Sequence, residues 1–77
     1  MNAVNIFPNP VYDQLFFEYT SEPGKLEFDL YDATGRLVIS RQVIDHTLNL
    51  YGIRQGIYFY HLYNNEAIDQ RGRILKE

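Results

Sequence analysis

The 77-residue chain contains no cysteine and no tryptophan, and only one methionine. Without cysteine, neither a disulfide framework nor a cysteine-based zinc site can hold the fold together. Ordering a chain of this length costs on the order of 100 kcal/mol, so burial of apolar side chains has to offset nearly all of that cost. The composition permits this, because 45% of the residues are hydrophobic and 16% are aromatic. A high aromatic content favours sheets, where flat side chains pack across strands.

Positive charge is scarce as well. Seven Lys and Arg residues against ten Asp and Glu residues give a net charge of −3. Nucleic-acid binding requires a clustered basic surface, so we expect no nucleic-acid partner. No apolar run approaches the ~20 residues that span a bilayer, and no transmembrane segment or signal peptide is expected in these residues.

The residues that catalysis or metal binding would need are isolated. His46 and His61 lie in strand-like contexts without further ligands at a supportive spacing. Asp29, Asp32 and Asp45 do not form a calcium-binding loop pattern. There is no nucleophile elbow around a serine and no glycine-rich phosphate loop. The sequence therefore predicts no enzyme, no metal and no cofactor.

Strand patterns dominate the chain. Residues 25–31 alternate strictly between apolar and charged side chains, as in a half-buried strand. Residues 56–63 are apolar or aromatic on both faces, which is typical of a central strand. Further strands are expected at residues 4–7, 14–19, 36–43, 46–50 and 71–77. In the last of these, Gly72 between two arginines predicts a β-bulge.

Turn residues separate these segments. Asp32 and Gly35 stand first and fourth in a type I turn pattern, which joins residues 25–31 and 36–43 as a hairpin. Turns are also expected at residues 21–24, 54–56 and 64–65, and Gly35 and Gly56 are expected at positive φ. About seven short strands with this spacing predict an all-β fold, a small immunoglobulin-like antiparallel β-sandwich.

The alternation also predicts a core in which large-to-small substitutions cost about 2–5 kcal/mol. Its expected members are Val4, Ile6, Leu15, Phe17, Leu26, Phe28, Leu30, Val38, Leu48, Leu50, Ile53, Tyr58, Tyr60, Leu62 and Ile74. The tyrosines leave a second interpretation open, because Tyr58, Tyr60 and Tyr63 could instead form a platform on which a sugar stacks.

Two prolines surround one asparagine near the start of the chain. Pro8 and Pro10 fix φ and donate no backbone hydrogen bond, and Asn9 is driven to extended geometry because it precedes a proline. The segment Pro8–Pro10 should therefore end the first strand and direct the chain into the second.

Four stretches, in this order, resemble the C-terminal sorting domain of the type IX (Por) secretion system of Bacteroidetes-type bacteria. They are "IFPNPVYDQL" (6–15), "LYDATGRLV" (30–38), "LNLYGIRQGIYFYHL" (48–62) and "GRILKE" (72–77). The family-motif residues carried over by the resemblance are Pro8, Asn9, Pro10, Asp32, Gly35, Arg36, Gly56, Tyr58 and Lys76.

The resemblance implies a delivery signal rather than an activity. Residues 1–77 would form a single sorting domain with a covalently linked cargo upstream of residue 1. The domain would dock the cargo, after its transit through the periplasm, on the outer-membrane machinery for export to the cell surface or the medium. A sortase-like peptidase would then act on it. Lys76 would offer an exposed positive charge to a negatively charged receptor surface.

Two other functions remain open at the level of sequence. The chain could be a carbohydrate-binding module of a secreted enzyme, or a structural β-sandwich that stabilises its neighbour. The sorting function differs from both because it predicts export of a fused reporter.

Overall fold

The computed structural model describes residues 4–20, 23–65 and 68–77. These residues contain seven strands and no helix. The strands are β1 (Asn5–Phe7), β2 (Gln14–Glu18), β3 (Glu27–Tyr31), β4 (Leu37–Gln42), β5 (Thr47–Asn49), β6 (Gly56–Tyr63) and β7 (Asp69–Lys76). The expected all-β class is confirmed. No helix in these ranges is long and apolar enough to cross a membrane.

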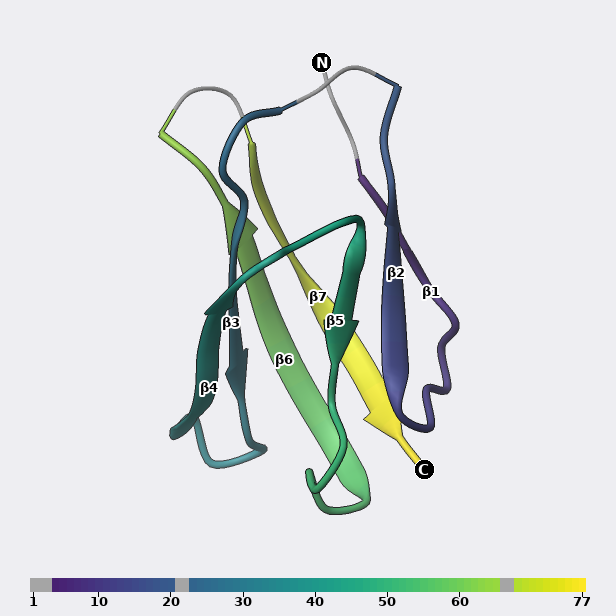
Figure 1. The fold of residues 1–77 in the computed structure, drawn as a ribbon. Coiled ribbons are helices and arrows are strands. Elements are labelled where there is room, and N and C mark those ends of the chain that lie inside the picture. The colour runs from purple at the N-terminus through teal and green to yellow at the C-terminus, as the bar shows by residue number, and fades with distance from the viewer. Residues whose placement is uncertain (1–3, 21–22, 66–67) are drawn as a thin grey trace.

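The strands form two antiparallel sheets that face each other as a sandwich (Figure 1). One sheet has the order β1-β2-β5, and the other has the order β4-β3-β6-β7. β6 is hydrogen-bonded on both sides, as its two apolar faces predict. The immunoglobulin-like sandwich expected from the sequence is confirmed, as is the hairpin of β3 and β4.

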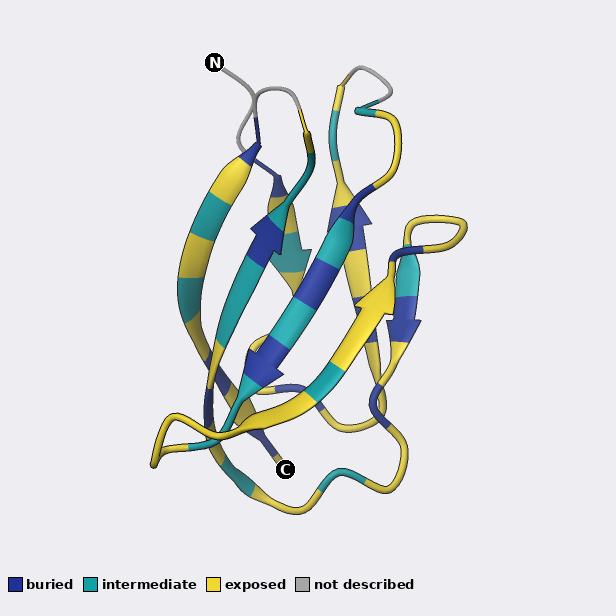
Figure 2. Cartoon of the chain, turned by 90° about the vertical axis from the view of Figure 1, so that its left-hand side faces the viewer, coloured by how far each residue is buried: buried dark blue, intermediate teal, exposed yellow. Residues whose placement is uncertain are grey.

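Burial alternates along the strands, with inward residues packed between the sheets (Figure 2). Eleven of the expected core residues are buried, and Ile6, Ile53 and Tyr60 are partly buried against them. The eleven are Val4, Leu15, Phe17, Leu26, Phe28, Leu30, Leu48, Leu50, Tyr58, Leu62 and Ile74. The core further includes Val11, Val43 and Ile68, which were not among the expected core residues.

The expectation for Val38 is wrong, because this side chain is 37% exposed. β3 pairs Leu30 with Ile39 and Tyr31 with Leu37, so Val38 is the extra residue of a β-bulge in β4. Because of the bulge, Ile39 and not Val38 points inward from β4, and Ile39 packs against the core.

The bulge expected at Gly72 is also absent. β6 and β7 pair without a register shift from Gly56↔Lys76 to Tyr63↔Asp69, and Gly72 lies opposite Tyr60. The two arginines beside Gly72 point outward and the glycine lies on the inward side, so the alternation is unbroken.

The turn expected at Asp32–Gly35 and the positive φ expected of Gly35 and Gly56 are confirmed. Gly35 has φ +90° and its N–H donates to the Asp32 carbonyl at 2.9 Å, while Gly56 has φ +150°. In the turn at residues 21–24, Ser21 and Glu22 lie outside the described residues. His46 differs from its expected strand context, because it occupies a turn before β5 with φ +61°.

Candidate functional site

The loops within the quoted stretches lie at one end of the sandwich. Consecutive strands run in opposite directions, so the loops 8–13, 32–36 and 50–55 and the residues after β7 all lie at the lower end in Figure 1. We call these loops together with residues 76–77 the motif end. β1 begins at the opposite end. This clustering follows from the alternating strand directions and is not apparent from the motifs alone.

Pro8–Pro10 ends the first strand as expected. β1 stops at Phe7, and both X-Pro bonds, Phe7–Pro8 and Asn9–Pro10, are cis. The exposed segment then leads to Val11, which is fully buried.

Asn9 joins this loop to the last strand. Its side-chain amide donates to the Arg73 carbonyl and accepts from the Leu75 N–H, both at 3.0 Å. Arg73 and Leu75 present these backbone groups at the edge of β7 that does not face β6. The Asn9 side chain therefore replaces a peptide group of a neighbouring strand and covers an otherwise open edge.

Backbone hydrogen bonds extend the same contact. The Val11 N–H donates to the Leu75 carbonyl at 2.9 Å, and the Glu77 N–H donates to the Val11 carbonyl at 2.7 Å. Further up β7, the Gln70 side chain bonds both backbone groups of Val4, accepting at 3.0 Å and donating at 2.8 Å. The start of the chain thus holds β7 along its outer edge.

The expectation that Lys76 is exposed is wrong. Lys76 is only 6% exposed, and its Nζ donates to the main-chain oxygen of Glu77 at 2.9 Å. Lys76 follows Ile74 by two positions, and the period of two places both side chains inward. The stem of Lys76 therefore closes the lower end of the core and is not displayed to a receptor.

Burial of Lys76 predicts an effect on stability. We expect Lys76→Glu to lower the free energy of unfolding by about 1–3 kcal/mol, because it puts a carboxylate beside the Glu77 oxygen. Lys76→Met retains the apolar stem and should cost less. Chemical denaturation of both variants measures this, and a Lys76→Glu midpoint equal to that of the parent would refute the buried placement.

Asp32 and Arg36 belong to the tight turn between β3 and β4. Asp32 Oδ1 accepts from the Thr34 hydroxyl at 2.6 Å, the Thr34 N–H at 2.9 Å and the Arg36 N–H at 3.0 Å. Arg36 Nε lies 3.4 Å from Asp32 Oδ2. The hydrogen bond from the Thr34 hydroxyl, followed by that from the Arg36 backbone, lowers the pKa of Asp32 from 3.8 to about 2.

This lowered pKa predicts a pH dependence of stability. A carboxylate whose pKa falls on folding stabilises the fold fully above its unfolded pKa of 3.8, and this contribution disappears as the pH falls toward 2. Between about pH 5 and about pH 2, the melting temperature of Asp32→Ala should therefore fall less than that of the parent. Asp13→Ala, an exposed loop substitution, is the control. Equal losses for the parent and Asp32→Ala would show that the turn carboxylate does not contribute.

Gly56 and Tyr58 form the corner that leads into β6. The Tyr58 hydroxyl donates to the Arg54 carbonyl at 2.7 Å, four residues upstream. This is the tyrosine corner found at the same place in immunoglobulin-like sandwiches. Tyr58 and Tyr60 face inward and Tyr63 faces outward, so the three rings do not form a platform for a sugar.

The two histidines are held in separate contacts. His61 Nε2 lies 2.7 Å from Asp69 Oδ1, whereas His46 Nδ1 lies 3.1 Å from the Phe17 carbonyl and its ring stacks on Tyr19. Within residues 4–20, 23–65 and 68–77, no three His, Asp or Glu side chains gather as metal ligands would.

Comparison with known proteins identifies the family. A family model described as a secretion system C-terminal sorting domain matches residues 5–77, including residues 64–71, which lie outside the four quoted stretches. No curated protein and no solved structure matches the chain. Members of this family are in general non-catalytic signals that engage the type IX machinery and direct export to the cell surface or the medium. The chain therefore belongs to the secretion system C-terminal sorting domain family, and its function is that of a C-terminal sorting signal for type IX secretion.

Proposed function

We propose that residues 1–77 act as one sorting domain without enzymatic activity, attached to a cargo upstream of residue 1. The domain docks this cargo, from the periplasm, on the outer-membrane part of the type IX machinery. A sortase-like peptidase then acts on the delivered protein. The observation that carries the proposal is the family match over residues 5–77.

The arrangement of the two ends supports this function. A cargo attached before β1 leaves the sandwich at the end opposite the motif end (Figure 1). The motif end therefore stays accessible to the machinery while the cargo is attached. We propose that the nine family-motif residues act mainly by shaping this end, with Pro8–Pro10 holding the outer edge of β7 and Lys76 closing the core beside it.

A fusion experiment tests the proposed function. A reporter with its own signal peptide is placed before residue 1 and expressed in a host that has the type IX system. We expect the reporter at the cell surface or in the medium, and we expect it to remain in the periplasm of a strain that lacks the system. Retention in both strains would refute the sorting function.

Asn9 provides a sharper test of the motif. Asn9→Ala removes both hydrogen bonds to β7 and should lower the free energy of unfolding by about 1–3 kcal/mol, with a corresponding loss of exported reporter. Asn5→Ala is the matched control, since within the described part of the chain Asn5 Nδ2 bonds only the exposed Glu18 side chain, at 3.0 Å. If the Asn9→Ala and Asn5→Ala fusions unfold and are exported alike, the hydrogen bonds from Asn9 to β7 neither stabilise the domain nor support its export.

A further inference from the structure

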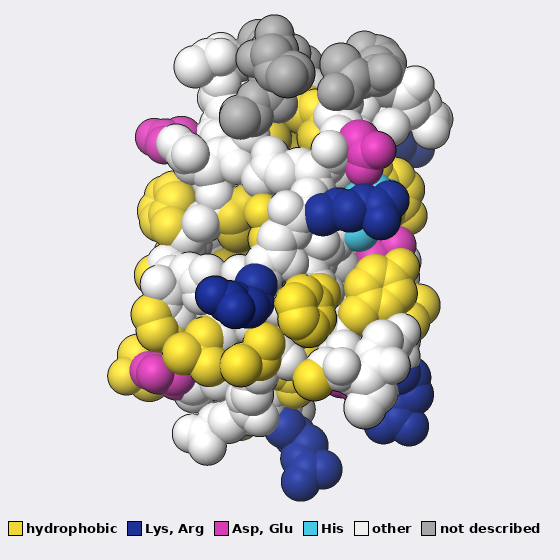
Figure 3. All heavy atoms as spheres, turned by 180° about the vertical axis from the view of Figure 1, so that it is seen from behind, with side chains coloured by type: hydrophobic (Ala, Val, Ile, Leu, Met, Phe, Trp, Pro, Cys, Tyr) yellow, Lys and Arg dark blue, Asp and Glu magenta, His cyan; other side chains and the backbone are white. Residues whose placement is uncertain are grey.

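The outer face of β6 and β7 combines exposed apolar side chains with arginines. Ile57 is 49% exposed, Phe59 46% and Leu75 38%, all on the side of the sheet that faces away from the core. In the strand register, Phe59 lies between Tyr31 and Arg73, and His61 lies beside Arg71. Figure 3 shows this side of the molecule, with Lys and Arg side chains set among hydrophobic groups.

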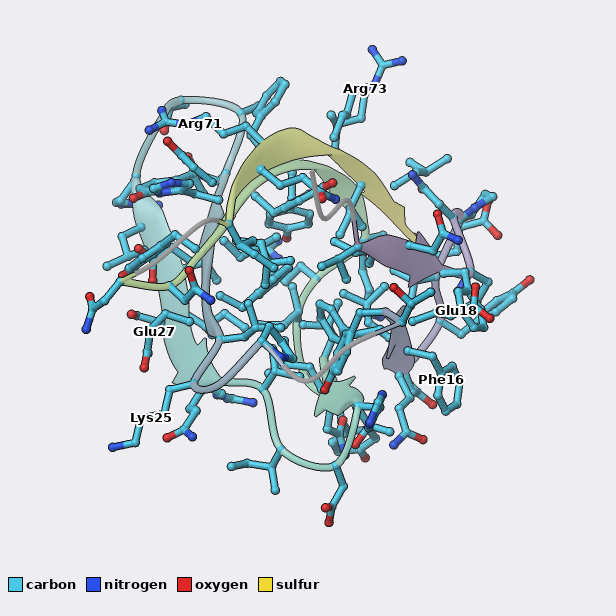
Figure 4. All side chains as sticks on the ribbon, turned by 90° about the horizontal axis from the view of Figure 1, so that it is seen from above. Phe16, Glu18, Lys25, Glu27, Arg71 and Arg73 are labelled. Carbon is cyan, nitrogen blue, oxygen red and sulfur yellow. The ribbon has the colours of Figure 1, made fainter. Side chains whose placement is uncertain are left out.

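The two arginines are available for a partner. Among the described residues, the Arg73 guanidinium has no hydrogen-bond or ion-pair partner. Arg71 Nε approaches Asp69 Oδ1 only to 3.8 Å, and that oxygen already lies 2.7 Å from His61 Nε2. Figure 4 shows both arginines pointing away from the sandwich, on a different side from Glu18 and Phe16. Because Arg71 and Arg73 stand two positions apart on one strand, their Cα atoms are about 7 Å apart.

Between them the surface is hollowed. A shallow depression of about 510 Å³ is lined by Tyr31, Phe59, His61, Arg71 and Arg73, together with Tyr60 and Gly72. Its size suits one or two apolar side chains of a partner. Aromatic and arginine side chains around such a depression are typical of the residues that dominate protein–protein binding energy.

We propose that this face, hereafter the arginine face, docks on an acidic protein surface of the type IX machinery. Carboxylates of the partner pair with Arg71 and Arg73, and an apolar side chain enters the depression over Phe59. The charge of the chain supports this occupant, because the net charge is −3 while this face displays Arg71, whose ion pair with Asp69 is long, and Arg73, which has no ion-pair partner among the described residues. Two exposed arginines are too few for a polyanion such as nucleic acid. Lys76 is buried, so Arg71 and Arg73 are the cations that β7 displays.

This inference rests on the proposed function, and the same reporter fusion tests it. We expect Arg71→Glu/Arg73→Glu to reduce surface delivery about tenfold or more without lowering the melting temperature of the purified domain. Lys25→Glu/Arg41→Glu makes the same change in net charge elsewhere and should deliver within about twofold of the parent. Because Arg41 also donates to the Asn49 carbonyl at 2.9 Å, the melting temperature of this control is measured as well. Arg71→Gln/Arg73→Gln removes the charge without reversing it and serves if the Glu pair unfolds the domain.

The outcomes separate the face from the function. Delivery of both arginine variants at the level of the parent overturns the proposed face and leaves the sorting function intact, whereas a parent fusion that is not exported refutes the function itself. Binding of the purified domain to outer membranes from secretion-competent cells, compared with secretion-deficient cells, should weaken with salt only when the arginines are present. Dimerisation of the parent in sedimentation, abolished by the same substitutions, would assign the face to a second copy instead.

Discussion

Phe28→Ala is expected to lower the free energy of unfolding by about 3–5 kcal/mol. Phe28 is the second residue of β3 and is fully buried. Its ring meets Phe17 of the opposite sheet edge-on at a centroid distance of 5.6 Å and stacks on Tyr60 at 5.6 Å. Phe28→Ala removes the ring that both Phe17 and Tyr60 contact, and it leaves a cavity between the sheets. Since small domains are stable by only about 5–15 kcal/mol, this loss is enough to unfold a domain whose stability lies at the lower end of that range.

Chemical denaturation of the purified domain measures the effect. Phe59→Ala is the matched control, because Phe59 lies on β6 of the same sheet but faces outward, and we expect it to change stability by less than about 1 kcal/mol. An unchanged midpoint for Phe28→Ala would place β3 in the wrong register. Phe28→Leu should recover part of the loss, since it refills some of the volume.

The regular alternation of β3 explains why its core residues could be predicted. Leu26, Phe28 and Leu30 repeat every second position between charged residues, and all three are buried. In β4 the same reasoning failed at Val38, because apolar residues occupy three successive positions and a bulge decides which of them turn inward. A bulge depends on how two strands pair, and one strand alone does not specify it.

The errors at Lys76 and Gly72 have a different origin. In both cases the alternation of β7 was intact, and the residue type was given more weight than the position. Lys76 takes an inward position because its long apolar stem can be buried while its amine reaches the Glu77 oxygen. The period of two could have indicated this placement, since it follows Ile74 by two residues.

The long-range contacts of the motif end could not be predicted from the sequence. Asn9 bonds Arg73 and Leu75 across more than 60 positions of the chain. Nothing local in "FPNP" identifies the strand that its amide will meet. The sequence did predict that Pro8–Pro10 ends the first strand, and the resemblance associated this segment with the last strand as parts of one family pattern. The structure gives that association a physical basis, since the two segments are in contact.

Gly72→Ala is expected to destabilise the domain by about 1–3 kcal/mol through overpacking. A Cβ atom at position 72 would lie 2.7 Å from Cε2, 2.8 Å from the hydroxyl oxygen and 2.9 Å from Cζ of Tyr60. The Tyr60 ring cannot move aside without loss, because it stacks on Phe28 and its hydroxyl accepts from Gln70 Nε2 at 3.1 Å. Gly72 is therefore a packing glycine, present because a tyrosine of the neighbouring strand fills its side-chain space.

A double-mutant cycle distinguishes this explanation from backbone strain. In a Tyr60→Ala background the clash is absent. The loss of unfolding free energy caused by Gly72→Ala should therefore be smaller there than in the parent, by about 1 kcal/mol or more. Gly35→Ala is the control, because Gly35 has φ +90° and no atom within 4 Å of a built Cβ. Its cost comes from the backbone and should be the same in both backgrounds. If Gly72→Ala also costs the same in both, the tyrosine does not explain the glycine, and the pairing of β6 with β7 around Tyr60 has to be revised.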